Sequence, residues 1–157
     1  MRKVILPNLK SFHMFQNKKI LITGGTGSLG TALTTRLLKT DVDTIRIFSR
    51  DELKQSQMES QLDDDRLRFL IGDVRDKERL KKAVEGIDIV IHTAALKQVP
   101  VIEYNPFEAI KTNVQGAQNL VDVCLDKNVG FALAIGTDKA VSPFNTYGAT
   151  KLLMERL

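Results

Sequence analysis

The sequence predicts an α/β fold: a doubly wound parallel sheet with helices on both of its faces. Short apolar runs, several of them rich in β-branched residues, alternate with amphipathic stretches along the chain. This alternation is typical of a parallel sheet, because two parallel strands need a long crossover that is usually a helix. A glycine-rich segment joins the first apolar run to the first amphipathic stretch, as in a strand–turn–helix unit.

The first half of the chain contains three predicted strands and three predicted helices. Residues 19–23 (KILIT) form a β-branched run beside glycines, and residues 31–40 place three leucines on one helical face. The next strands are predicted at 44–49 (TIRIFS) and 67–73 (LRFLIGD), and the helices at 51–62 and 77–86. Gly86 is expected to end the third helix.

The second half continues the same pattern. Residues 88–95 (DIVIHTAA) and 131–137 (FALAIGT) are the fourth and fifth predicted strands. Between them, residues 105–128 are expected to form one long helix with Pro106 near its start. A last helix runs from about Tyr147 to the end of the chain.

The length of 157 residues suits one domain. We assign residues 14–157 to this single α/β domain. Residues 1–13 are expected to be a mobile N-terminal extension, and no function is assigned to them.

Composition excludes several classes of protein. A hydrophobic content of 43% and a charged content of 27% are typical of a soluble globular protein. No apolar run approaches the roughly 20 residues that span a bilayer. The start of the chain has no secretory signal pattern. The single cysteine, Cys124, cannot form an internal disulfide, which favours the cytoplasm, and we expect it to lie in a helix core.

The net charge of +4 does not indicate nucleic-acid binding. Residues 1–19 hold five basic residues and no acidic one, so the rest of the chain sums to −1. No predicted helix carries a basic stripe with interleaved aromatic residues. We therefore predict no nucleic-acid partner, no membrane partner and no metal site.

The glycine-rich segment TGGTGSLG has the pattern G-x-x-G-x-x-G at Gly24, Gly27 and Gly30. It follows a predicted strand and opens a helix, which is the context that a dinucleotide-binding loop requires. The glycines permit a tight turn, close approach of a pyrophosphate and close helix–strand packing. A glycine-rich turn without a ligand is the alternative. If the loop binds phosphates, its other contacts are Thr26, Ser28 and Leu29.

The end of the second strand predicts NADP rather than NAD. A carboxylate at this place binds the ribose 2′-hydroxyl of NAD, whereas an arginine accommodates the 2′-phosphate of NADP. The chain offers Ser49, Arg50 and Lys54, which together suit a phosphate. Asp51 could reverse this preference, but we expect it to cap the following helix.

Four further residues have expected positions or contacts at the sheet. Asp73, at the end of the third strand, is placed to meet the adenine amino group, with Val74 packing on the ring. A simple turn aspartate is the alternative interpretation. We expect His92 to be a structural residue at a strand end, and Asn113 to hydrogen-bond backbone across the sheet.

Tyr147 and Lys151 lie four residues apart, on one face of the last predicted helix. They could be two exposed surface residues. A free tyrosine, with a pKa of about 10, is a poor base at neutral pH, but a nearby ammonium favours the phenolate. After a dinucleotide loop and a fifth strand, the pair has the position of a catalytic base and its tuning cation.

At these residues the chain resembles the extended short-chain dehydrogenases. The motifs GTDKAVSPFNTYGATK, FSRDELKQ, HTAALKQVP and NVQGAQNLV narrow the resemblance to the UDP-N-acetylglucosamine 4,6-dehydratases of bacterial surface-sugar pathways, over about residues 14–157. The resemblance implies a Rossmann-type domain, a nucleotide-sugar substrate and contacts to cofactor and substrate from Ala94, Ala95 and Lys97.

The resemblance also implies a mechanism. Tyr147 takes the proton of the sugar 4-hydroxyl while hydride passes from carbon 4 to NADP. Lys139 then removes the carbon 5 proton, for which it must first be neutral, and Asp138 protonates the departing 6-hydroxyl. The hydride then returns from the cofactor to carbon 6. Thr137 belongs to the same TDK segment and is assigned to the catalytic group with these residues. Inversion at carbon 5 is the favoured outcome. A solvated turn is the alternative interpretation of the TDK segment.

Two departures from the family lead to further expectations. The family usually has serine where this chain has Gly136, so contact with the sugar could be weaker. Family members are also about twice as long, and this chain ends in the helix that holds Tyr147 and Lys151. We expect it to lack the substrate domain, to bind NADP weakly, to turn over little substrate and to form homo-oligomers. A nucleotide-sugar 4-epimerase and a non-catalytic NADP-binding module are the alternatives.

Overall fold

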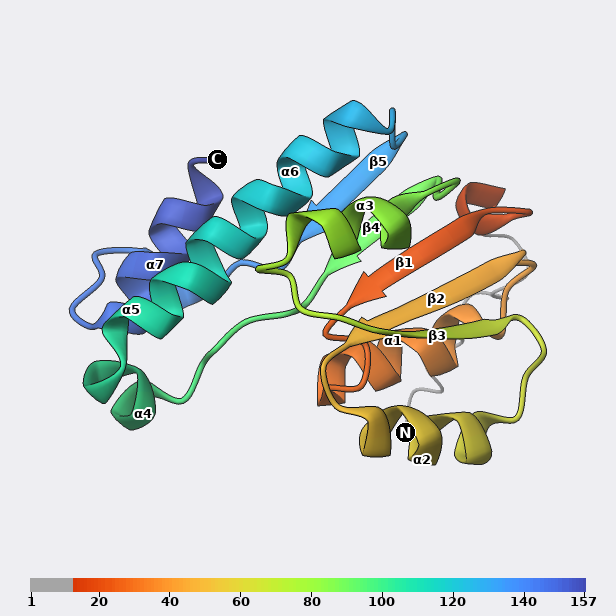
Figure 1. The fold of residues 1–157 in the computed structure, drawn as a ribbon, viewed down its shortest axis with the longest axis horizontal. Helices are drawn as coiled ribbons and strands as arrows, with labels where there is room; N and C mark the ends of the chain where they lie inside the picture. Colours follow the sequence, from red (N-terminus) through yellow and green to blue (C-terminus); the bar gives the residue numbers. More distant parts are fainter. Residues whose placement is uncertain (1–12) are drawn as a thin grey trace, which may run out of the picture.

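The structure, a computed structural model, describes residues 13–157 and contains one five-stranded sheet in which every strand is parallel (Figure 1). The strand order is β3-β2-β1-β4-β5, so the first strand lies at the centre. This arrangement confirms the predicted fold class. The predicted mobile extension, apart from His13, lies outside the described residues.

The strands begin where the sequence predicts, or one residue later, but three of them are shorter. Their bounds are β1 Lys19–Thr23, β2 Thr44–Ser49, β3 Leu67–Ile71, β4 Ile89–His92 and β5 Phe131–Ala134. Residues 93–95 and 135–137 therefore leave the sheet at its carboxyl edge. Because all strands are parallel, these segments and the turn after β1 meet at one edge of the sheet.

Helices cover both faces of the sheet (Figure 1). The helical elements are η2 His13–Phe15, α1 Ser28–Leu37, α2 Glu52–Leu62, α3 Lys77–Val84, α4 Val99–Tyr104, α5 Pro106–Ala109, η3 Ile110–Gln115, α6 Gly116–Asp126, η4 Asp138–Ala140 and α7 Thr146–Glu155. Helices α1 and α2 lie on one face, and α3 and α6 lie on the other.

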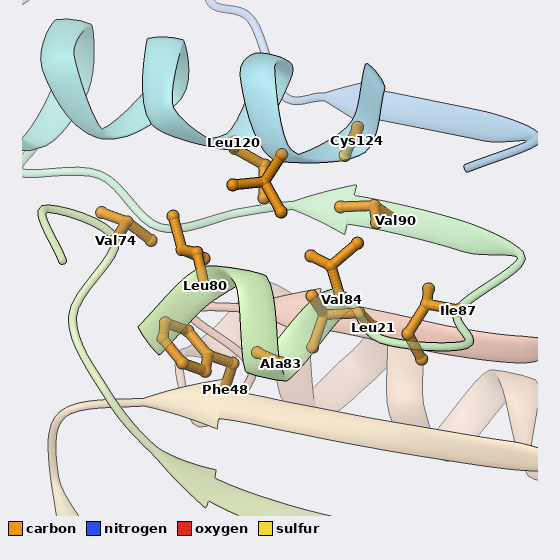
Figure 2. Packing of buried hydrophobic residues seen from close by; sticks show 11 residues of the cluster. Leu21, Phe48, Val74, Leu80, Ala83, Val84, Ile87, Val90, Leu120 and Cys124 are labelled. Carbon is orange, nitrogen blue, oxygen red and sulfur yellow. The ribbon is translucent and has the colours of Figure 1, made fainter. Parts of the chain in front are cut away.

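Alternation along the central strand divides the core into two layers. Ile20 and Ile22 pack with residues of α1 and α2, whereas Leu21 points to the opposite face and packs with α3 and α6. Figure 2 shows the second layer, in which Phe48 of β2 and Val90 of β4, the strands on either side of β1, pack with residues of α3 and α6. Every one of these side chains is almost completely buried. Burial of apolar side chains on both faces is the main stabilising contribution in such a fold. It also fixes the register of the sheet.

The predicted long helix at 105–128 is not a uniform α-helix. Helix α5 continues into η3, a π-helical segment, and then into α6. The short helix α4 before it was not expected from the sequence. Pro106 does begin its helix, as predicted. π-helical segments are frequent at functional sites, and this one borders the cavity described below.

The outer edge of β5 is open within the described part of the chain. All four β5 residues are exposed, including Phe131 and Leu133. A shallow apolar groove of about 130 Å³ lies between this strand, β4 and α6, with Met154 of α7 at its wall. Among residues 13–157, no helix is long and apolar enough to cross a membrane.

Candidate active site

A cavity of about 540 Å³ opens at the carboxyl edge of the sheet. Strand β1 pairs with β2 on one side and with β4 on the other, and the cavity lies where the strand order reverses. Ligands bind at this position in open α/β sheets. Every residue predicted above to contact the cofactor lines the cavity, and the structure adds Phe48, Asp51, Gly72, Thr93, Thr112, Ile135 and Gly136.

The glycine loop has the close contacts that its sequence predicts. Gly24 has a φ of +68°, and a Cβ there would come within 2.8 Å of the Ala94 backbone. A Cβ on Gly30 would come within 2.5 Å of Gly25. Both contacts exclude a side chain, so the loop can turn tightly and pack against α1.

The start of α1 is suited to an anion. Its N-cap is Gly27, which has no capping side chain, and its first turn contains no acidic residue. The first amides of a helix have no intrahelical acceptor, and the helix dipole favours negative charge there. Ser28 and Leu29 of this turn line the cavity. The loop therefore fits the pyrophosphate of a dinucleotide.

Two cations and a buried glutamine lie at the end of the cavity that β2, β3 and α2 form. The Gln55 amide donates hydrogen bonds to the Ser49 hydroxyl and carbonyl and to the Leu70 carbonyl, at 2.9–3.1 Å. Arg50 and Lys54 are more than half exposed. Gln55 thus fixes Ser49, whereas the two cations are exposed to solvent.

Asp51 caps α2, as the sequence predicts. Its side chain accepts a hydrogen bond from the Lys54 amide at 3.0 Å, and this bond is the main reason that the pKa of Asp51 is lowered. The carboxylate also lies 3.5 Å from the Lys54 ammonium and lines the cavity.

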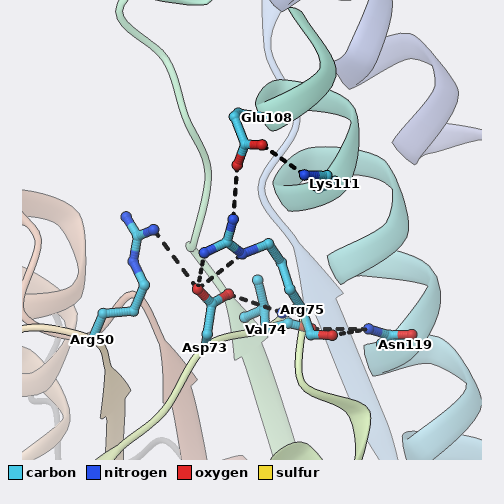
Figure 3. Close-up of polar contacts among 7 residues, drawn as sticks. All are labelled: Arg50, Asp73, Val74, Arg75, Glu108, Lys111 and Asn119. Carbon is cyan, nitrogen blue, oxygen red and sulfur yellow. Dashed lines mark hydrogen bonds and ion pairs between the residues drawn. The ribbon is translucent and has the colours of Figure 1, made fainter. Parts of the chain in front are cut away.

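Asp73 is part of an ion-pair network that the sequence did not predict (Figure 3). Its carboxylate accepts hydrogen bonds from the side chain of Arg75 at 2.7 and 2.9 Å and lies 3.8 Å from the Arg50 guanidinium. Burial acts to raise the pKa of Asp73, but the hydrogen bonds from Arg75 outweigh it, so the pKa is lowered. Val74, next to it, is buried in the core and also reaches the cavity.

Tyr147 and Lys151 of α7 line the same cavity. The Lys151 ammonium is buried and donates a hydrogen bond to the Ile135 carbonyl at 2.5 Å. Burial lowers the pKa of Lys151, opposed by the charge of Glu155. Within residues 13–157, no hydrogen bond joins Tyr147 and Lys151. The structure thus places the pair in one cavity and ties the lysine to the strand-end loop.

The predicted acid–base segment Thr137–Lys139 lies beside the cavity without lining it. The side chains of Asp138 and Lys139 are 88% and 48% exposed, with 3.6 Å between carboxylate and ammonium. A hydrogen bond from Thr137, followed by the charge of Lys139, lowers the pKa of Asp138. The catalytic roles that the resemblance implies for these residues thus remain a prediction, because the structure places them beside the cavity and not in its lining.

The backbone of the segment is nevertheless held against α7. A Cβ built on Gly148 would come within 2.2 Å of the Lys139 carbonyl oxygen. Gly148 follows Tyr147 directly, so η4 is packed one residue from the predicted catalytic base. The Gly148 amide donates to the Asn145 side chain at 2.8 Å, which fixes the start of α7.

Three structural residues behave largely as the sequence predicts. His92 ends β4, is buried, and shares a 2.6 Å hydrogen bond with Thr23. Cys124 lies in the core of α6, where burial raises the pKa of its thiol to about 11. Asn113 does bond backbone, but its partner is Leu96 in the loop after β4, not a neighbouring strand. Its amide is turned toward this loop because Asn113 lies in η3, which follows α4 and was not expected.

Sequence reasoning missed Arg75, Gln55 and Thr112. Gln55 had a detectable signal, because it lies three residues before Met58 on the inward face of α2. Thr112 lies in η3, and its buried hydroxyl has no hydrogen-bond partner among the described residues. In residues 13–157, no group of His, Cys, Asp and Glu side chains is arranged to hold a metal ion.

Comparison with known proteins agrees with this architecture. A UDP-N-acetylglucosamine 4,6-dehydratase (inverting) of Campylobacter jejuni is 54% identical over 145 residues, which cover 92% of this chain and 43% of that protein. A UDP-glucose 4-epimerase of Rickettsia felis is 49% identical over 148 residues, which cover 92% of this chain and 43% of the epimerase. The chain thus spans less than half the length of these relatives.

The crystal structure of Pen from Bacillus thuringiensis superposes with a TM-score of 0.89 at 42% identity and covers 90% of this chain and 44% of that one. The family model described as polysaccharide biosynthesis protein matches residues 20–157. The chain therefore belongs to the polysaccharide biosynthesis protein family, within the extended short-chain dehydrogenases and reductases.

Proposed function

We propose that this chain carries the cofactor-binding and acid–base residues of a nucleotide-sugar 4,6-dehydratase that acts on UDP-N-acetylglucosamine. The observation that carries the proposal is the packing of η4 on α7. The Lys139 carbonyl oxygen occupies the space that a side chain at Gly148 would need, so the Lys139 backbone is packed against the residue that follows Tyr147. An epimerase, which only moves a hydride at carbon 4, has no need of this additional acid–base pair.

Each residue has a role that follows from its position. Tyr147 in the cavity would take the proton of the 4-hydroxyl. The buried ammonium of Lys151 would favour the phenolate and orient the ligand, while its bond to the Ile135 carbonyl fixes its own direction. Lys139 would remove the carbon 5 proton, and Asp138 would protonate the 6-hydroxyl. Both side chains are exposed in this structure, so they must turn toward the bound sugar.

We infer that the cofactor is NADP. When bound, it supplies a hydride acceptor and donor for the transient oxidation at carbon 4. The glycine loop and the start of α1 would hold its pyrophosphate. Ser49, Arg50 and Lys54 would face the 2′-phosphate, since Asp51 is engaged in capping α2.

A 4-epimerase is the second candidate, favoured by the similarity to the Rickettsia felis protein. Two relatives with different reactions match nearly the same residues of this chain, so the reaction has to be read from the product. A non-catalytic NADP-binding module is the third candidate. It gives no reason for Asp138, Lys139 and Tyr147 to occur together.

The test is to incubate the gene product, read to its natural stop codon, with UDP-N-acetylglucosamine and NADP in deuterated water. We expect a product that has lost one water and gained one deuterium at carbon 5, detected by mass spectrometry. An epimerase would leave the mass of the sugar unchanged apart from exchange. An unaltered sugar together with tight NADP binding would favour the binding module.

A further inference from the structure

The two cations at the end of the cavity that β2, β3 and α2 form are already paired. The Arg50 guanidinium lies 3.8 Å from Asp73, and the Lys54 ammonium lies 3.5 Å from Asp51. These four charges sum to zero, so their net charge alone does not attract an anion to this end of the cavity. A ligand phosphate must draw the cations away from their carboxylates.

Asp73 has a second and closer cation. The Arg75 side chain donates two hydrogen bonds to one Asp73 oxygen, at 2.7 and 2.9 Å, and the Arg75 amide donates to the other oxygen at 2.9 Å. The carboxylate is 22% exposed and the arginine is 36% exposed. Asp73 therefore keeps a compensating charge when Arg50 moves away.

Arg75 is itself held from the opposite side (Figure 3). It donates to Glu108 at 2.9 Å, and Glu108 accepts from Lys111 at 2.7 Å. The Asn119 amide donates to the carbonyls of Val74 and Arg75. Arg75 does not line the cavity, so its effect on a ligand is indirect, and Asp73 is the lining residue that its side chain bonds.

We propose that Arg75 is a positioning residue for recognition of the 2′-phosphate, an inference that rests on the proposed NADP site. By keeping Asp73 paired, Arg75 allows Arg50 to leave the carboxylate and bind the phosphate. Without Arg75, Asp73 would compete with the phosphate for Arg50, and it would be left as an uncompensated negative charge whenever Arg50 moved to the phosphate. NAD carries only a 2′-hydroxyl, which tolerates a nearby carboxylate.

The test measures the dissociation constants of NADP⁺ and NAD⁺ by isothermal titration calorimetry on the gene product and its variants. We expect Arg75→Gln to weaken NADP⁺ binding about tenfold and NAD⁺ binding less than about twofold. Asp73→Asn with Arg75→Gln should restore the NADP⁺ to NAD⁺ ratio to within about twofold of the unaltered protein, because the unpaired charge is gone. The matched control is Arg79→Gln, since Arg79 bonds the Ile71 carbonyl at the same strand end without touching Asp73.

The outcomes separate this inference from the proposed function. Equal weakening of NADP⁺ and NAD⁺ by Arg75→Gln would mean that Arg75 only supports the loop, and would overturn the inference. So would a double variant whose ratio is not restored, or a control that shifts the ratio equally. If the unaltered protein does not prefer NADP⁺, then the proposed cofactor is wrong and the inference falls with it.

Discussion

His92 and Thr23 are paired twice, once by backbone register and once by their side chains. They are partners at the ends of the parallel strands β4 and β1, and a 2.6 Å hydrogen bond joins the imidazole to the hydroxyl. The other ring nitrogen has no partner among the described residues. Burial, followed by the charge of Lys151, lowers the pKa of His92 to about 4. The imidazole is therefore neutral in the folded protein at pH 7.

This pairing predicts a loss of stability in acid. The unfolded pKa of histidine is about 6.5, so below that pH the unfolded state binds more protons than the folded state. The free energy of unfolding should then fall by about 1.4 kcal/mol per pH unit until the pH approaches the folded value. Urea unfolding between pH 7 and pH 4 measures this slope. His92→Asn should have a shallower slope, and equal slopes would contradict the assignment.

Replacing Gly148 by alanine should disturb the acid–base segment. The new methyl group would collide with the Lys139 carbonyl, since 2.2 Å is far inside contact distance. We expect a loss of about 2 kcal/mol in stability and a decrease in the proposed dehydratase activity. Thermal unfolding and product formation are the measurements. Gly130→Ala is the control, because a Cβ there would meet its nearest neighbour at 3.5 Å.

The proposed roles of Asp138 and Lys139 can be separated by isotope exchange. Asp138→Asn should slow water loss by about a hundredfold or more, while deuterium still enters carbon 5. Lys139→Met should abolish both, because the base that removes the carbon 5 proton is gone. Mass spectrometry in deuterated water distinguishes the two results. If Lys139→Met retains exchange at carbon 5, then the proposed assignment of Lys139 as the base and Asp138 as the acid is wrong.

Gln55 should contribute more to stability and to cofactor binding than its place on a surface helix suggests. It is 5% exposed and bonds Ser49 and the Leu70 carbonyl. Gln55→Leu would leave these buried groups unpaired, so we expect a loss of about 2 kcal/mol and weaker NADP binding through Ser49. Gln57→Leu, at an exposed position of the same helix, should have little effect. Denaturant unfolding and cofactor titration compare the two variants.

The sequence was sufficient for the features that depend on local pattern. Apolar runs and glycines predicted all five strands, the loop before α1 and the cap at Asp51. It was not sufficient for contacts between distant segments. The pairing of Arg75 with Glu108 joins residues 33 positions apart, and charged side chains on surfaces show no periodicity that predicts such a partner. The π-helical segment was missed because it is built from residues that suit an α-helix equally well.

The exposed side chains of Asp138 and Lys139 show a second feature that the sequence does not predict, namely side-chain direction. Their proposed acid–base roles rest on the resemblance to the dehydratases, and side-chain direction at a short 3₁₀ turn depends on what covers it. The direction of the Lys151 side chain is not predictable either, because no spacing rule predicts its hydrogen bond to the Ile135 carbonyl.

The central position of β1 has a consequence for folding kinetics. Thr23 and His92 are 69 positions apart, whereas β1 and β2 pair through a much shorter connection. Loop closure over such a separation is slow, so the β1–β4 contact should form after the first βαβ unit. The ligand crevice lies between these two strand ends and does not exist until they meet. Recovery of dinucleotide affinity during refolding should therefore lag behind recovery of helical content.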